Sequence, residues 1–254
     1  MTDELAEHRE TIAAGCRVLA AEGVVTGTLG HISARVGDRM LIRCRGRGDR
    51  GLRFAEADEV RLVDFDGRGD DPAAGYNVPN ELPIHGELYR ARPAVRAVVH
   101  AHPPALLVAG LAGLPLRPVF GAYNIPAARL AVDGIPVWPR SALVRRPELA
   151  HQMIAAMGDR PVCVLRGHGV TVVGDSVEQA VIRTLDLDVL ARVTLELARL
   201  GSLAEVPELS AEDIAELPDL GASFNDATAW RHYVAKTDEG TKSNGTFGPG
   251  VMGK

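Results

Sequence analysis

Three short apolar runs, made largely of β-branched residues, most constrain how this chain can fold. They occupy residues 97–100, 162–165 and 170–173, and each is bounded by histidine, glycine, proline or arginine. Apolar runs of this length predict buried strands. Segments with helical spacing lie between and after them, and these predict helices over 104–112, 147–157 and 176–200. Strands interleaved with helices in this way predict one α/β domain.

The remaining segments extend this pattern. Apolar spacing predicts a helix over 3–22 and another over 81–90, with Asn80 as a plausible cap. Further short strands are predicted at the end of the segment 23–36 and over 40–43, 60–67 and 135–138. Residues 238–254 are rich in glycine and lack periodicity. We therefore expect a single domain over 1–236 and a flexible tail, or a lid, over 237–254.

The composition excludes several classes of protein. Hydrophobic residues make up 46% of the 254 residues and charged residues 24%, a balance that supports a sizeable core. The net charge of −5 argues against nucleic acid or an anionic membrane as the main partner. The three cysteines show no CxxC spacing, the N-terminal segment does not resemble a signal peptide, and no apolar run reaches the roughly 18 residues of a membrane span. A cytoplasmic protein without disulfides is expected.

Two histidines at the end of one strand and a third between two glycines suggest a metal site. His100 and His102 alternate along an extended segment, so their imidazoles project from the same face, about 6–7 Å apart. His168 stands between glycines just after the run 162–165, and it can join the pair if the two strands are neighbours. Neutral imidazoles suit Zn²⁺, Fe²⁺, Mn²⁺ or Co²⁺, so the residue types do not choose among these metals.

Each of these residues also has a simpler interpretation. An HxH pair can occur by chance, and a histidine at a strand end is often a hydrogen-bonded structural residue. Glu81 opens the helix 81–90, where a carboxylate complements the helix dipole. Near a metal, the same carboxylate can act as a ligand and as a general acid or base. Spacing alone does not decide between these alternatives.

In combination, the motifs resemble the class II aldolase/adducin family over roughly residues 8–200. The matching segments, in chain order, are TGTLGHIS (26–33), NELPIH (80–85), AVVHAHP (97–103), LRGHG (165–169) and the helix from Ser176. The resemblance implies a three-layer αβα fold with a central mixed or antiparallel sheet. It also implies one divalent metal ion per subunit, held by His100, His102 and His168, with Glu81 as the catalytic acid/base that can also bind the metal.

The resemblance further implies an assembly. Enzymes of this family are usually homotetramers with sites at subunit interfaces, where a tyrosine from a neighbouring subunit often donates a proton. Tyr123 and Tyr233 are the candidates for that tyrosine here. Tyr123 is placed in the catalytic set and Tyr233 in the substrate-binding set.

Departures from the family's sugar-phosphate aldolases indicate a different substrate. Those enzymes have Gly-Asn where this chain has Gly30-His31, and small hydroxyl residues that cradle a phosphate where it has an arginine-rich segment and Pro79-Asn80. Arg43, Arg45 and Arg47 alternate along that segment, so they can share one face and bind a carboxylate. Arg43 and Arg45 are the stronger candidates, with Asn80 beside them. The alternative is a solvated basic loop.

His31 adds a titratable group at the substituted position. It can protonate a ring carbon or hold a phenolic oxygen, and its alternative role is that of a structural histidine in a turn.

The pattern resembles the branch of the family that decarboxylates hydroxylated aromatic acids, such as dihydroxyphthalates. A metal-stabilised enolate would accept the electrons that the departing CO₂ leaves behind. The alternatives are an aldolase acting on a hydroxy-keto acid or sugar phosphate, a non-haem iron oxygenase, and a non-catalytic adducin-like binding protein.

Overall fold

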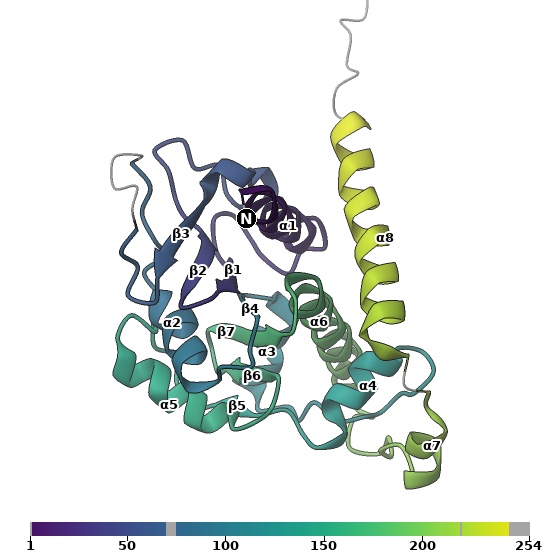
Figure 1. Cartoon of the computed structure of the whole chain (residues 1–254). Helices are drawn as coiled ribbons and strands as arrows, with labels where there is room; N and C mark the ends of the chain where they lie inside the picture. Colours follow the sequence, from purple (N-terminus) through teal and green to yellow (C-terminus); the bar gives the residue numbers. More distant parts are fainter. Residues whose placement is uncertain (1, 70–74, 219, 244–254) are drawn as a thin grey trace, which may run out of the picture.

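The computed structural model describes residues 2–69, 75–218 and 220–243. Within these residues, seven strands form one sheet in the order β3-β2-β1-β4-β7-β6-β5 (Figure 1). Their bounds are β1 His31–Val36, β2 Arg39–Arg43, β3 Val60–Asp64, β4 Ala97–Ala101, β5 Val137–Trp138, β6 Val162–Leu165 and β7 Gly169–Gly174. β5 runs parallel to β6, and the other neighbouring pairs are antiparallel. The sheet is therefore mixed, as the motifs predict.

Helices cover both faces of this sheet. One layer contains α1 (Thr2–Ala21), α3 (Pro104–Ala112), α4 (Ile125–Val132) and α6 (Val177–Arg199), and the opposite layer contains α2 (Leu82–Ala91) and α5 (Pro147–Met157). Successive strand residues point to opposite faces, so Val99 of β4 packs in the first layer while Val98 packs against α2 and α5. The predicted three-layer αβα fold is confirmed.

The start of α2 differs from the prediction. The helix begins at Leu82 with Pro83 in its first turn, and Glu81 occupies the N-cap position in place of Asn80. The Glu81 side chain makes no capping hydrogen bond. Proline lacks a backbone N–H and tolerates the first turn of a helix, which fits a start at this point. The Glu81 carboxylate is thus left free for partners outside the helix.

Three helices lie where no element was predicted. They are α4, α7 (Ala211–Glu216) and α8 (Gly221–Ser243). α8 runs beside α6 (Figure 1), and its residues Trp230 and Tyr233 pack against the core. The helix crosses the expected boundary at residue 237, so the first residues of the predicted tail are helical; 244–254 lie outside the described residues.

Two global expectations can be compared with the structure. Cys16, Cys44 and Cys163 are all buried and unpaired, in line with the absence of a disulfide framework. None of the helices in the described part of the chain combines the length and the apolar character that crossing a bilayer requires.

Candidate metal centre

Four side chains from three parts of the chain converge at one end of the sheet. His100 lies in β4, His102 directly follows that strand, His168 lies in the turn between β6 and β7, and Glu81 precedes α2. β4 lies between β1 and β7 in the sheet. β6, the strand before His168, is therefore not its neighbour, although the sequence interpretation made that pairing the condition for His168 to join the pair. Because β6 and β7 form an antiparallel hairpin, its turn still brings His168 to the end of β4.

The ligand atoms of this cluster lie close enough to share one ion. His100 Nε2 is 2.8 Å from His102 Nε2, and Glu81 Oε2 is 3.4 Å from the Nε2 atoms of both His100 and His168. Metal–ligand bonds of about 2.0–2.2 Å place neighbouring ligand atoms about 3–3.5 Å apart in octahedral or tetrahedral geometry. The three rings have centroid separations of 4.8 and 4.9 Å, closer than the predicted 6–7 Å.

The surroundings favour the protonation states that bind a metal. Burial, followed by the charges of His100 and His168, lowers the pKa of His102 to about 3, so its imidazole is neutral at physiological pH. His100 Nδ1 lies 3.4 Å from the Thr171 hydroxyl, a partner that leaves Nε2 to face the cluster. Three imidazole nitrogens and one carboxylate oxygen form a donor set that fits a divalent transition metal.

Glu81 is held in place through Oε1, the carboxylate oxygen that is not part of the cluster. The backbone N–H of Val144 donates to Glu81 Oε1 over 2.9 Å, while Oε2 faces His100 and His168. Burial alone would raise the pKa of Glu81, but its hydrogen bonds to these two histidines outweigh that effect and lower the pKa. The carboxylate therefore carries a negative charge and remains only 5% exposed.

Gly169 allows β4 and β7 to approach each other beside the cluster. A Cβ atom at this position would lie 2.3 Å from the Ala101 carbonyl oxygen and 2.7 Å from His102 Cδ2. The two glycines that flank His168 thus have different roles, since only Gly167 adopts a left-handed conformation, with φ of 70°.

Replacing Gly169 with alanine is expected to push His102 out of the cluster. The purified variant should retain less than half of the bound metal of the parent, measured by elemental analysis. Alanine at Gly48, which like Gly169 lacks a positive φ and where a Cβ would meet no atom within 4 Å, is the matched control. Full metal content in the Gly169 variant would show that the strands can separate without moving His102.

His31 belongs to a buried polar chain behind the cluster. Its ring stacks on that of His100 with centroids 5.0 Å apart, because His31 and His100 are partners in the β1–β4 ladder. His31 Nδ1 lies 2.6 Å from His85 Nε2, and His85 Nδ1 lies 2.6 Å from Ser33 Oγ. Ser33 Oγ is in turn 2.8 Å from the Tyr89 hydroxyl. The catalytic role predicted for His31 depends on this chain, which the sequence interpretation did not include.

The structure corrects the interpretation of Arg43. Its side chain is 1% exposed, and its guanidinium pairs with the carboxylates of Asp49 and Glu59. Arg43 and Arg45 do share a side, as alternate residues should, but that side faces Asp49, whose second oxygen is 3.8 Å from Arg45 Nε. Because its guanidinium is already paired with two carboxylates, Arg43 holds the segments of Asp49 and Glu59 in place and is not available to bind a substrate.

Arg45 is the more accessible of the two arginines. It is 42% exposed and donates through Nη2 to the Thr28 carbonyl oxygen over 2.9 Å. Thr28 lies in the segment that leads to Gly30, where a Cβ would be 3.1 Å from the His100 carbonyl oxygen. Arg45 is thus hydrogen-bonded to a segment in which Gly30 packs closely against the backbone of His100. Asn80 is exposed and next to Glu81 in the chain.

Neither candidate tyrosine contacts the cluster within this chain. Tyr123 is 76% exposed and touches the ring of Phe120. Tyr233 is half-buried in α8, where burial and then the charge of Glu22 raise the pKa of its hydroxyl. Tyr123 is open to a neighbouring molecule, whereas Tyr233 is packed into its own subunit.

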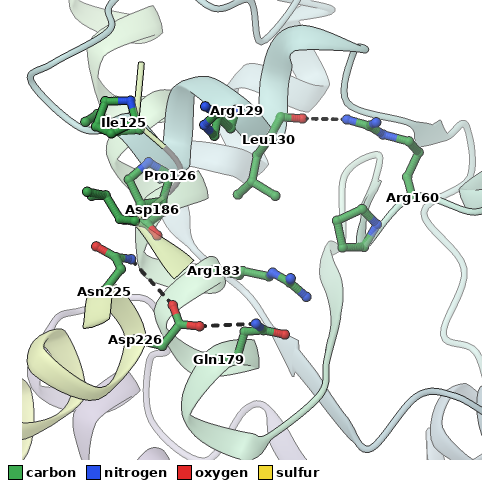
Figure 2. Close-up of a pocket in the computed structure, with 13 residues that line it drawn as sticks. Ile125, Pro126, Arg129, Leu130, Arg160, Gln179, Arg183, Asp186, Asn225 and Asp226 are labelled. Atoms are coloured by element: carbon green, nitrogen blue, oxygen red, sulfur yellow. Dashed lines mark hydrogen bonds between the residues drawn. The ribbon is translucent and has the colours of Figure 1, made fainter. Parts of the chain in front are cut away.

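A cavity of about 350 Å³ lies apart from the metal cluster, between α4, α6 and α8 (Figure 2). Arg183 and Asp186 of α6 line it together with Asp226 of α8. Asp186 Oδ1 accepts from Asn124, and the buried Oδ2 has no partner among the described residues. Burial, aided by the charge of Asp226, raises the pKa of Asp186 to about 6.

Replacing Asp186 with asparagine is expected to stabilise the protein at pH 8 but not at pH 4. A carboxyl group with a raised pKa loses stability for the folded state as pH rises from its unfolded pKa of about 4 to its folded pKa of about 6, so the benefit of the replacement grows over that range and is complete above it. The shift corresponds to about 2–3 kcal/mol, or several degrees in Tm. Thermal unfolding at both pH values is the measurement, with exposed Asp159→Asn as control. An equal change in Tm at pH 4 and pH 8 would contradict the prediction.

Comparison with known proteins agrees with the geometry of the centre. Residues 10–195 match the family model described as the class II aldolase and adducin N-terminal domain. The chain belongs to this family.

Curated relatives extend the match almost to full length. The chain is 54% identical over 236 residues to a 3,4-dihydroxyphthalate decarboxylase of Arthrobacter keyseri, an alignment that covers 90% of this chain and 93% of the relative. It is 50% identical over 239 residues to the enzyme of the same name from Terrabacter sp. strain DBF63, covering 93% and 99%. The predicted family is therefore confirmed, and these relatives support the predicted carbon–carbon lyase.

A solved structure supports the class II aldolase fold independently. An aldolase II superfamily protein from Pseudomonas syringae superposes with a TM-score of 0.77 at 22% identity, covering 92% of this chain and 93% of that one. At this level of identity the likeness concerns the fold alone.

Proposed function

We propose that this chain is a divalent-metal-dependent decarboxylase that converts 3,4-dihydroxyphthalate to 3,4-dihydroxybenzoate and CO₂. The observation that carries the proposal is the complete cluster of Glu81 and three histidines in a chain that is 54% identical to a 3,4-dihydroxyphthalate decarboxylase. The carboxylate at ring carbon 2 is the one released, since it lies next to the hydroxyl at carbon 3. Ketonisation of that hydroxyl makes this carboxylate part of a β-keto acid.

His100, His102, His168 and Glu81 are the residues that would hold the metal, one ion per subunit. A bound Zn²⁺, Mn²⁺, Fe²⁺ or Co²⁺ supplies electrostatic stabilisation of the negative charge that develops on the substrate oxygens.

Glu81 moves the proton in this proposal. Its Oε2 takes the proton of the 3-hydroxyl and delivers it to ring carbon 2, which gives the keto form. When the bond from carbon 2 to the carboxylate breaks, its electron pair returns to the ring and the oxygen at carbon 3 becomes a phenolate. One proton from solvent completes the balance. The Val144 N–H bond to Oε1 holds the carboxylate in place while Oε2 works.

Arg45 and Asn80 bind the carboxylate that remains on the substrate. Replacing Arg45 with alanine is expected to raise KM about tenfold or more while leaving kcat within a few-fold, because a charge-assisted hydrogen bond contributes about 1.5–3 kcal/mol. Exposed Arg47→Ala is the matched control from the same loop. An unchanged KM for the Arg45 variant would exclude this role.

The active form is a homo-oligomer, which we propose to be a tetramer acting in the cytoplasm. Tyr123 is 76% exposed beside Phe120, so it can reach the site of a neighbouring subunit and donate a proton there. The net charge of −5 fits a small-molecule carboxylate as partner, bound locally by arginine, better than nucleic acid or membrane.

An assay of CO₂ release tests the proposed reaction. The metal-loaded protein should release one CO₂ per 3,4-dihydroxybenzoate formed, and chelation should stop both. Formation of 2,3-dihydroxybenzoate would mean that the other carboxylate leaves. If the loaded protein leaves dihydroxyphthalate intact but cleaves a hydroxy-keto acid or sugar phosphate, or consumes oxygen with Fe²⁺, the decarboxylase proposal is wrong.

A further inference from the structure

The polar chain behind the metal cluster has a direction that its buried end determines. Tyr89 is 1% exposed, and among the described residues its hydroxyl has Ser33 Oγ as its hydrogen-bond partner. A buried phenol proton without an acceptor is costly, so Tyr89 must donate to Ser33.

Each following link is then determined. Ser33 accepts from Tyr89, so its own proton goes to its other partner, His85 Nδ1. Burial lowers the pKa of His85 to about 3, so this ring is neutral. With Nδ1 acting as an acceptor, the single ring proton of His85 lies on Nε2 and is donated to His31 Nδ1.

The last link places a donor at the metal cluster. Because His31 Nδ1 accepts the proton of His85, the single proton of the His31 ring lies on Nε2. His31 Nε2 forms no hydrogen bond with a described residue and is not among the fully enclosed atoms that lack a partner, so it keeps some contact with solvent, on a ring that stacks against His100. A substrate oxygen can approach it there.

We propose that Tyr89, Ser33 and His85 are positioning residues that fix His31 as the tautomer protonated on Nε2. His31 therefore offers the substrate a hydrogen-bond donor and not a base. This inference rests on the proposed function only for the identity of the substrate, whose anionic carboxylate or phenolate oxygens such a donor suits. If His31 lost its proton, protons would shift along the polar chain and leave a buried tyrosinate at Tyr89, which is unfavourable. His31 therefore donates a hydrogen bond to a substrate oxygen, while Glu81 transfers the proton of the reaction.

Histidine nitrogen NMR of the Zn²⁺-loaded protein tests the tautomer directly. The His31 signals, assigned by their loss in His31→Asn, should show a protonated Nε2 and an unprotonated Nδ1. Tyr89→Phe frees the Ser33 hydroxyl to rotate, so both tautomers should appear while metal content and folding persist. Tyr76→Phe, which removes an exposed hydroxyl bonded to Asp58, is the matched control and should change nothing. A wild-type protein protonated on Nδ1, or a Tyr89 variant that keeps one tautomer, would overturn the proposal.

A double-mutant cycle tests whether the tautomer of His31 affects ligand binding. Tyr89→Phe should weaken binding of 3,4-dihydroxybenzoate about two- to fivefold, since only part of the protein then presents the donor. In a His31→Asn background the same change should have no further effect, because an asparagine amide donates without the chain. Equal weakening in both backgrounds would show a merely structural role. Should Tyr89→Phe unfold, Ser33→Ala interrupts the same chain. A correct tautomer in a protein without decarboxylase activity would refute the proposed reaction alone.

Discussion

Replacing Glu81 with glutamine is expected to lower kcat by about 10²–10⁴ while the protein keeps its metal. Glutamine retains an oxygen for the Val144 N–H bond and has nearly the same volume, but it cannot accept and release a proton. The three imidazoles remain in place to hold the ion. Steady-state turnover of 3,4-dihydroxyphthalate, together with metal analysis of the same sample, measures both parts of the expectation.

Glu87→Gln provides the matched control on the same helix. Glu87 carries an identical side chain, but it pairs with Arg90 and His151 and takes no part in the cluster. Its variant should turn over at the parent rate. If Glu81→Gln kept more than about a tenth of the parent kcat, proton transfer by this carboxylate would have to be abandoned, because general acid–base catalysis contributes at least about a hundredfold.

Replacing His102 with alanine is expected to remove both the metal and the activity. The remaining ligands, two imidazoles and one carboxylate, still converge, but His102 Nε2 is the atom nearest to His100 Nε2 and completes the three-histidine face. Dialysed variant protein should contain little metal, and its turnover should fall to background even with the metal supplied at the parent's saturating concentration.

His151→Ala is the corresponding control for loss of a histidine. Its side chain is 60% exposed and bonds to Glu87, away from the cluster. Parent-like metal content in His102→Ala, with activity lost, would assign His102 to the substrate and leave the ion to the other three residues. Retained activity without metal would contradict the account of the site altogether.

The sequence predicts the convergence of His100, His102 and His168 because their spacing reflects backbone geometry. Alternation along a strand places His100 and His102 on one face whatever lies around them, and a glycine with positive φ at residue 167 permits the turn that presents His168. The strand order could not be read in the same way. That β7 separates β4 from β6 follows from pairing between distant segments.

The polar chain was missed although its signal is present in the sequence. Glu81, His85 and Tyr89 recur every four residues, so they lie on one side of α2. His31 and Ser33 alternate on β1 toward the same layer. The sequence assigns His85 to an apolar stripe with Leu82, Ile84 and Leu88, and only the contact between β1 and α2 reveals its hydrogen bonds.

The contacts of Arg43 could not be predicted from the sequence. An arginine at a strand end suggests an anion partner, but the sequence does not reveal that Asp49 and Glu59 fold against Arg43. Nor does it show that Tyr233 packs on its own subunit while Tyr123 projects outward. Local periodicity encodes none of these features, because they depend on how loops and separate segments fold against one another.

The polar chain from Tyr89 to His31 limits which substitutions such a protein can accept. Each of its four members satisfies the next, so altering one leaves a polar atom stranded in the interior. Positions 31, 33, 85 and 89 are thus expected to covary in natural sequences. An amide side chain is expected at position 31 only where the proton of the residue at position 85 still has an acceptor. On the proposal that His31 holds a substrate oxygen, substrate preference depends on these buried positions, and a search for new specificities should randomise them together.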